Sequence, residues 1–505
     1  MKKLMLLGLA AIAALTAGTA QAQSTLRIGL WDDPDTIDPT LGRLYSGRLI
    51  LNMICDKLFD VTPDLKIVPK LATGYEWSSD GMALTIKLKP GVKFHDGEPF
   101  NAAAVKFSIE RHLTMPASFR KSEIDVVKTV EVVDDLTVRF VLSKRSAPLL
   151  SHLTDRAGMV VSPKAATALG AKFGTAPVCN GPFKFVQRVA QDKIVLERFP
   201  DYWDKGNVHF DQVVFVPIPD GTVRVTNLRS GQLDLIERVS PADLGALRAD
   251  KRVKVVGVPE LGYHVLRFNV GNGPKAGTPM GKDVRIRQAL EAAIDRKTLV
   301  QVVFNNDFLA GNQYVNPKNF YYNEAIPVPP RDVNRAKALL KEAGHPSYSF
   351  TLLTSTNPDW VQAAQVIQAM VAEAGFDMKI QVQEHATRGV NMQKGDFEAG
   401  FAFWSGRIDP DGNIGNHMTC NGAQNDSRYC NEKVDKLIDD ARQVADPAER
   451  KKHYDAATAQ LLEDRPILFL WHRMVITAHS AKLQGFAPNP DGIIRVQGMK
   501  LDTAS

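Results

Sequence analysis

The sequence lacks long charged runs and contains few cysteines. Beyond the first 22 residues it has no run of 18 apolar residues, so we expect no membrane-spanning helix there. No run of five or more Lys or Arg occurs and the formal net charge is only +6, which argues against a nucleic-acid-binding protein. Apolar residues make up 44% and charged residues 23% of the 505 residues, a composition typical of a folded, soluble protein of roughly two to four domains.

Motifs that carry catalysis or hold cofactors are also missing. No H-E-x-x-H, G-x-S-x-G or G-x-x-x-x-G-K-[ST] pattern is found. The absence of C-x-x-C removes the usual signals of redox and zinc-ribbon sites. The eleven histidines are scattered, and the spacing of His472 and His479 does not suit two ligands on one face of a strand. We therefore expect no metal, no cofactor and no enzyme, with a secreted hydrolase assembled from distant residues as the alternative.

The N-terminal residues resemble a secretory signal. Two lysines open the chain, an apolar core extends from Leu4 to about Leu15, and Ala20-Gln21-Ala22 forms an A-x-A cleavage pattern. The core is shorter than the ~20 residues of a spanning helix, so we expect cleavage rather than a retained anchor. An exported protein with such a signal is expected in a bacterial periplasm.

The four cysteines are compatible with this compartment. Cys55, Cys179, Cys420 and Cys430 form an even set, which favours disulfides in an exported protein. Four cysteines allow three pairings, and four free buried thiols are the alternative. Cys420 and Cys430 bracket a short polar loop that is easily closed, so we expect this pair. Cys55–Cys179 follows by elimination.

Hydrophobic periodicity predicts a mixed α/β chain. Residues from about 75 to 145 alternate between apolar and polar side chains, which predicts strands, with one helix near Ala102–Leu113 that Asn101 caps. The C-terminal half instead alternates helices with strands, which indicates an α/β lobe. A Gly- and Pro-containing break at about 265–275 is a candidate crossing between two lobes. The helices expected in the second half cover about 286–303, 332–343 and 361–374.

Several short blocks carry a family resemblance. They are Val68-Pro69-Lys70-Leu71-Ala72, the segments 75–81 and 88–97, Asp201-Tyr202-Trp203, Asp283-Val284-Arg285 and the segment 336–344. In this order, behind an export signal, they resemble the periplasmic solute-binding proteins of the peptide/nickel class of ABC importers. This is the dipeptide- and oligopeptide-binding family, also called extracellular solute-binding family 5.

The resemblance implies an α/β fold with two lobes, a hinge between them and an enclosed ligand. It further implies a β-rich subdomain in the first lobe, at about 75–170, which agrees with the strand periodicity. We accordingly expect a signal peptide at 1–22, lobe I at 23–268, lobe II at 269–479 and a return to lobe I at 480–505.

The expected ligand site lies in the segment 403–413, which is similar to the family's G-W-x-x-D-x-x-[DE]-P loop. In dipeptide binders, the Asp three residues after the Trp holds the α-ammonium of the peptide. Here that position is Arg407, and Asp409 is the acid that could take its role. We therefore expect Trp404, Arg407 and Asp409 at the ligand.

An arginine in this loop changes the expected ligand. A guanidinium presents a rigid fork suited to carboxylate or phosphate, so the ligand is expected to carry an anionic group, as in an acidic or modified peptide or an opine. The alternative is an ion pair of Arg407 with Asp409 or Asp411 that only shapes the loop.

The function implied is the periplasmic substrate-binding component of an ABC transporter that imports peptides or peptide-like solutes. Its partners would be a small-molecule ligand and the permease subunits in the inner membrane, with no nucleic acid, and the protein would be a monomer. Alternative ligands within the family are an opine, a sugar-derived anion, haem or a nickel chelate.

Overall fold

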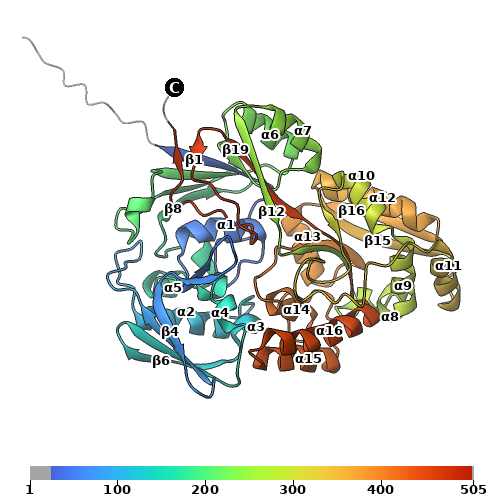
Figure 1. Ribbon diagram of the computed structural model, residues 1–505, viewed down its shortest axis with the longest axis horizontal. Helices are drawn as coiled ribbons and strands as arrows, with labels where there is room; N and C mark the ends of the chain where they lie inside the picture. Colours follow the sequence, from blue (N-terminus) through green and yellow to red (C-terminus); the bar gives the residue numbers. More distant parts are fainter. Residues whose placement is uncertain (1–23, 503–505) are drawn as a thin grey trace, which may run out of the picture.

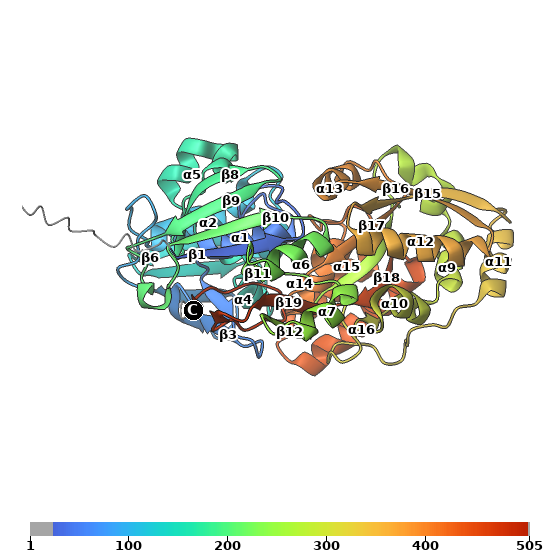
Figure 2. The ribbon, with the colours of Figure 1, turned by 90° about the horizontal axis from the view of Figure 1, so that it is seen from above.

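The computed structural model describes residues 24–502, so the expected signal segment lies outside the described residues. Two α/β lobes lie side by side, each built around its own mixed sheet (Figures 1 and 2). This arrangement confirms the expected two-lobed α/β class. Within residues 24–502, no helix is both long and apolar enough to cross a membrane.

The first lobe is built on a seven-stranded sheet in the order β12-β19-β11-β1-β10-β9-β8. β1 lies at its centre and pairs in parallel with β10 and β11, and its Leu26, Ile28 and Leu30 side chains are fully buried. The strands are β1 (Thr25–Leu30), β8 (Phe183–Val189), β9 (Lys193–Arg198), β10 (Gln212–Pro217), β11 (Leu235–Ile236), β12 (Val253–Pro259) and β19 (Met474–Ser480). The helices are α1 (Tyr45–Ile54), α5 (Pro163–Leu169), α6 (Gly221–Arg229) and α7 (Leu244–Ala249).

The expected β-rich subdomain is a four-stranded antiparallel sheet in the order β4-β5-β7-β6. Helix α2 (Ala102–Thr114) packs against it, and the Asn101 side chain accepts a hydrogen bond from the backbone N–H of Ala104, as the sequence predicted. The other elements here are β2 (Phe59–Val61), β3 (Ile67–Pro69), β4 (Ala72–Trp77), β5 (Ala83–Leu88), α3 (Lys121–Ile124), β6 (Val127–Asp134), β7 (Thr137–Leu142) and α4 (Leu149–His152).

The second lobe is built on a six-stranded sheet in the order β14-β18-β13-β17-β15-β16. Its strands are β13 (Tyr263–Phe268), β14 (Leu309–Ala310), β15 (Tyr348–Ser355), β16 (Phe376–Gln383), β17 (Ala399–Trp404) and β18 (Ile467–His472). Its helices are α8 (Pro279–Lys282), α9 (Val284–Ala293), α10 (Arg296–Phe304), α11 (Val333–Glu342), α12 (Pro358–Ala372), α13 (His385–Gln393), α14 (Asp411–Met418), α15 (Glu432–Gln443) and α16 (Pro447–Asp464).

One expected helix of this lobe is divided. The apolar spacing from 286 to 303 predicts a continuous helix, but the structure has α9 and α10 with a break at Ile294 and Asp295. The Asp295 carboxylate accepts hydrogen bonds from the backbone N–H groups of Lys297 and Thr298 and so starts a new helix. The helical apolar spacing continues through the break because both helices pack on the same core.

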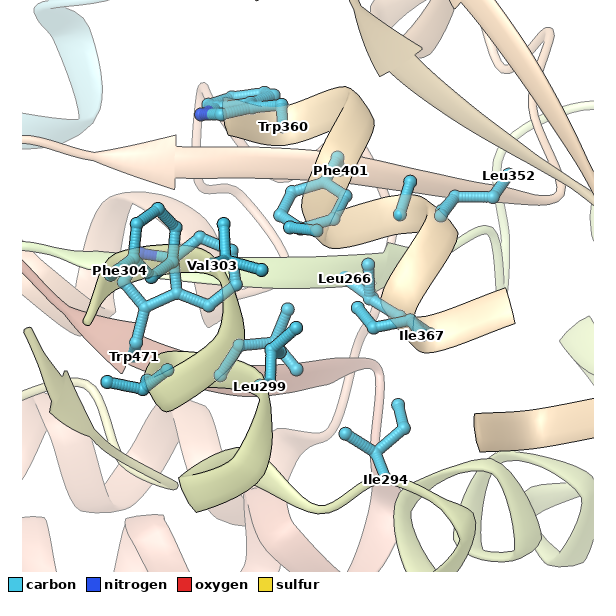
Figure 3. Close-up of a cluster of buried hydrophobic side chains, with 14 of the residues drawn as sticks. Leu266, Ile294, Leu299, Val303, Phe304, Leu352, Trp360, Ile367, Phe401 and Trp471 are labelled. Carbon is cyan, nitrogen blue, oxygen red and sulfur yellow. The ribbon is translucent and has the colours of Figure 1, made fainter. Parts of the chain in front are cut away.

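The core of the second lobe joins residues that are far apart in the sequence. Figure 3 shows Leu266, Phe401 and Trp471 from three strands packed with side chains of α10 and α12. All three are at most 1% exposed. This core holds β17 rigidly, and β17 leads directly into the predicted ligand loop.

Two short crossings connect the lobes. β12 belongs to the first sheet and β13 to the second, so the chain crosses at residues 260–262; it returns at Arg473, between β18 and β19. The sequence placed the boundaries after residues 268 and 479. They differ because β13 pairs with β17 and β18, and because β19 pairs with β12 and β11. We propose the crossings 260–262 and 473 as the hinge.

The chain end covers the first lobe. Residues 481–502 form the short pair β20 (Leu483–Gln484) and β21 (Lys500–Leu501), and Ile493, Val496 and Met499 are buried in the core of that lobe. The 3₁₀ segments are η1 (Arg156–Gly158), η2 (Gly170–Thr175), η3 (Lys205–Asn207), η4 (Pro241–Asp243) and η5 (Pro274–Gly277).

Both expected disulfides are present. Cys420 pairs with Cys430 across ten residues, and Cys55 pairs with Cys179 across 124 residues. The long bridge ties the end of α1 to the segment before β8, so it fastens two parts of the first lobe. The short one closes the loop that follows α14.

The two bridges should differ in their effect on stability. Chain-entropy arguments assign about 4–5 kcal/mol to a loop above 100 residues and about 2–3 kcal/mol to one near ten. Replacing Cys55 and Cys179 together by Ser is therefore expected to lower the free energy of unfolding more than the same change at Cys420 and Cys430. Urea denaturation of the two double variants measures this, and a larger loss from the short loop would contradict the expectation.

Candidate functional site

The sequence-predicted loop connects β17 to α14 at the boundary between the lobes. Trp404 is buried, and its indole Nε1–H donates a hydrogen bond to Asn413 Oδ1 at 3.0 Å. The guanidinium of Arg407 stacks on the indole, with its Cζ 4.3 Å from the ring centroid. The same Asn413 oxygen accepts the backbone N–H of Arg407 at 2.7 Å. Asn413 therefore fixes two of the predicted residues relative to each other.

Arg407 forms an ion pair with the opposite lobe. Its Nε lies 3.1 Å from Oδ2 of Asp155, and both side chains are 5% exposed or less. Asp155 also pairs with Arg48 at 2.6 Å and with Arg156 at 3.5 Å. Burial would raise the pKa of Asp155, but the three guanidinium groups hold it well below its usual range. The single carboxylate of Asp155 thus forms ion pairs with three arginines.

The two acids proposed as alternative partners of Arg407 are engaged elsewhere. Asp409 forms a bidentate pair with Arg450, at 2.7 and 2.8 Å, and does not line the cavities described below. Asp411 pairs with Arg442 at 2.6 Å and with His152 of the first lobe at 3.0 Å. The structure therefore brings Trp404 and Arg407 together and places Asp409 in a separate ion pair.

A small cavity of about 50 Å³ lies between the lobes beside Trp404. Tyr45, Phe403 and Ser405 contribute to its wall. Its most frequent lining residue is arginine, with members from both lobes. They are Arg43, Arg48 and Arg156 from the first lobe and Arg267 and Arg388 from the second.

Positive charge is in excess around this cavity. Asp426 is its single acidic lining residue and pairs with Arg43 and with Arg267, the latter at 3.3 Å. Arg388 donates to the carbonyl oxygen of Phe401, and no carboxylate of residues 24–502 lies within ion-pair distance of it. Burial and the nearby Arg43 lower the pKa of Arg388 to about 9. Counting Arg407 and Asp155, six guanidinium groups face two carboxylates.

A second inter-lobe cavity, of about 270 Å³, adjoins the first. His385 lines both. The second cavity has the opposite charge, because its acidic lining residues are Asp32, Asp33 and Glu384. Asp32 and Asp33 follow directly after β1, and Glu384 precedes α13. The boundary between the lobes thus has a basic part and an acidic part. Among residues 24–502, no cluster of three or more His, Cys, Asp or Glu could hold a metal ion.

Sequence reasoning did not find most of these residues. The five lining arginines come from four separate segments of the chain, because Arg43 and Arg48 are close neighbours, and no spacing rule connects these segments. Asp32 had a usable signal, because polar residues directly after a central parallel strand lie where α/β sheets bind ligands.

Two α/β lobes that are joined by two short crossings and enclose charged cavities between them are typical of a solute-binding protein of the periplasmic type. The model of the bacterial extracellular solute-binding proteins, family 5, matches residues 66–426. The chain belongs to this family, which confirms the expected resemblance.

Relatives with assigned ligands extend the comparison. The glutathione-binding protein GsiB of Pectobacterium atrosepticum is 28% identical over 502 residues, which cover 97% of this chain and 96% of the relative. The periplasmic binding protein DppA of Helicobacter pylori, solved with the peptide STSA, has a TM-score of 0.87 and 26% identity over 95% of this chain and 99% of its own. The binding protein AgaA of A. tumefaciens R10, solved with agropinic acid, has a TM-score of 0.84 and 27% identity, and the match covers 95% of this chain and 99% of that protein.

These findings establish the class of function that the sequence predicted. The protein is a periplasmic binding component of an ABC importer and works with permease subunits. It binds a small molecule and is not an enzyme.

Proposed function

We propose that the imported solute is peptide-like and carries at least two anionic groups. The observation that carries this proposal is the excess of six guanidinium groups over two carboxylates around the first cavity. Buried cations without partners are costly, so a bound anion would compensate them. Guanidinium groups also match carboxylates in a bidentate geometry, which favours a dicarboxylate over a neutral peptide.

The relatives support this choice of solute. Glutathione, which GsiB is named for, is a tripeptide with two carboxylates and one ammonium group. An opine is the second candidate, because the AgaA structure contains agropinic acid. Both agree with the expectation that Arg407 signals an anionic ligand.

The roles of the three predicted residues follow from their contacts. Trp404 lines the first cavity, so we assign it to direct contact with the solute. Arg407 does not line that cavity, and its pair with Asp155 suits a role in holding the lobes together. Asp409 is engaged by Arg450, which favours a role in shaping the loop. All three assignments stay proposals.

Hinge closure would complete the site. The lining arginines come from both lobes, so the positive charge is assembled only when the lobes meet. Solute that binds this arrangement shifts the population toward the closed form, which the permease could then recognise. We further propose that the protein acts as a monomer, with each chain holding its own site.

Replacing Arg388 by Gln tests the proposed solute class. Because Arg388 lines the cavity without a carboxylate partner, its loss should weaken binding of an anionic solute by roughly 30-fold or more. Isothermal titration calorimetry with glutathione and with the neutral dipeptide Met-Leu measures this. The matched control is Arg335→Gln, which removes an exposed guanidinium of the same lobe. Tighter binding of the neutral dipeptide by the wild type would refute the proposal.

A further inference from the structure

The acidic part of the inter-lobe boundary contains three carboxylates, which differ in whether they have ion-pair or hydrogen-bond partners. Asp33 pairs with Arg188 at 2.7 Å. Glu384 caps α13, with its oxygens accepting the backbone N–H groups of Ala386 and Thr387 at 2.9 and 2.8 Å. Two of the three acids in the second cavity therefore already have partners for their charge.

Asp32 is the exception. It is 5% exposed and lines the second cavity, and its carboxylate oxygens form no hydrogen bond of good geometry among the described residues; the nearby Ser46 hydroxyl is a single neutral donor that lowers the pKa of Asp32 less than burial raises it. Its closest cation candidate is His385, whose Nε2 lies 3.6 Å from Oδ2. Burial, together with nearby arginines, holds the pKa of His385 well below its usual range, so this imidazole is neutral. It therefore supplies no charge to Asp32.

The remaining charged neighbours do not neutralise Asp32 either. Arg238 and Arg388 are within electrostatic reach, but Arg238 pairs with Glu260 at 2.7 Å and with Glu237 at 3.5 Å, and Arg388 lines the first cavity and forms no ion pair with Asp32. Asp35 and Glu237 add negative charge. Burial, followed by the effect of Glu237, raises the pKa of Asp32 well above its usual value. A buried carboxyl group beside a cavity thus has distant arginines but no charged cation within ion-pair distance among the described residues.

We propose that Asp32 binds a positively charged ammonium group of the same solute whose anionic groups meet the arginines. This rests on the proposed function. His385 lines both cavities, so a single peptide-like molecule can reach the acidic and the basic part together. An ammonium fits better than a metal ion, since one free carboxylate is too few for a metal site.

The proposal narrows the solute class and fixes its orientation. The solute is amphoteric, with an amino group at Asp32 and its carboxylates toward Arg43, Arg267 and Arg388. The amino anchor comes from the first lobe, after β1, whereas the sequence pattern had placed it in the loop of the second lobe. Glutathione carries its ammonium group at one end only, beside one of its two carboxylates, so binding of the ammonium at Asp32 distinguishes the two possible orientations.

The test compares glutathione with its des-amino analogue, in which hydrogen replaces the α-amino group. The analogue is smaller, so a loss of affinity cannot be steric. Wild type should bind glutathione at least 10-fold more tightly than the analogue. Asp32→Asn should bind the two equally. The matched control Asp192→Asn removes an exposed carboxylate next to Gln191, a residue of the same cavity wall, and should keep the wild-type ratio.

The outcomes separate the two proposals. Equal binding of both compounds by the wild type overturns the role of Asp32, whatever the folding of the variant, and leaves the anionic solute class intact. An unchanged preference in folded Asp32→Asn, checked by circular dichroism, overturns it as well. If the wild type binds none of glutathione, other acidic tripeptides and agropinic acid, the proposed function fails and this inference fails with it.

Discussion

Lowering the pH from 7 to 5 is expected to decrease the free energy of unfolding by several kcal/mol. Five buried histidines contribute most to this effect, each at most 6% exposed and each with a strongly lowered pKa. They are His112, His264, His385, His417 and His472. His95, with a pKa of about 4, and His479, with a lowered pKa, act in the same direction.

Each histidine is kept neutral by its surroundings. Burial is the main cause and lowers the pKa of His112 to about 3 and of His472 to about 4. His417 Nδ1 accepts a hydrogen bond from Arg267 Nη2 at 2.7 Å, so a proton at that nitrogen would break the bond. His264 is stacked between two aromatic rings and has no hydrogen bond. Protonation is therefore unfavourable in the folded state at all five positions.

The direction of the pH effect follows from these lowered values. An unfolded histidine takes up a proton near pH 6.5. In the folded protein the pKa is about 3 for His112 and about 4 for His472, and it lies well below the usual value for His264, His385 and His417. Stability is thus fully present above pH 6.5 and is lost as the pH falls toward the folded-state pKa. At pH 5 His112 and His472 each remove about 2 kcal/mol, and His264, His385 and His417 act in the same direction. Asp32 and Glu237, whose pKa values are raised by burial, take up protons in the folded state and offset part of the loss.

Urea denaturation at pH 7, 6 and 5 measures this dependence. His264→Phe removes one buried imidazole and keeps an aromatic ring in the stack, so its stability should fall less between pH 7 and pH 5 than that of the wild type, by at most about 2 kcal/mol. His209→Gln, at an exposed position, should follow the wild type. Equal stability of the wild type at pH 7 and pH 5 would show that these histidines are protonated in the folded protein.

Local features of the structure were largely predictable from the sequence. The periodicity around α2 and the cap at Asn101 depend on neighbouring residues only, and both were found as expected. The pairing of Cys420 with Cys430 was predictable for the same reason, because a short loop brings them together. Periodicity and capping rules are sufficient for features that depend only on residues close together in the sequence.

Contacts between the lobes were not predictable in the same way. The partner of Arg407 is Asp155, about 250 residues away, and no local rule distinguishes it from the nearby Asp409 and Asp411. The same holds for the excess of arginines, which arises only when two sheets face each other. The sequence indicated one charged loop. The net charge of the whole site can be counted only when the fold shows which residues lie together.

Replacing Asp155 by Ala is expected to destabilise the protein by about 3–5 kcal/mol, because the change leaves buried cations without their shared carboxylate. Urea denaturation at pH 7 measures the loss. Asp201→Ala is the matched control, since the ion pair of Asp201 with Lys93 has both side chains more than half exposed. That change should cost less than about 1 kcal/mol. Similar losses in the two variants would contradict this account.

A second substitution tests whether unpaired charge is the cause. Arg407→Met, added to Asp155→Ala, removes one of the uncompensated guanidinium groups, so the double variant should be more stable than the Asp155 variant alone. If the two losses simply add, Arg407 and Asp155 do not interact.

Because the pair joins the two lobes, Arg407→Met alone should weaken the closed form and reduce the affinity for acidic and neutral peptides by the same factor. Arg388→Gln instead should affect acidic peptides selectively, since Arg388 lines the cavity itself.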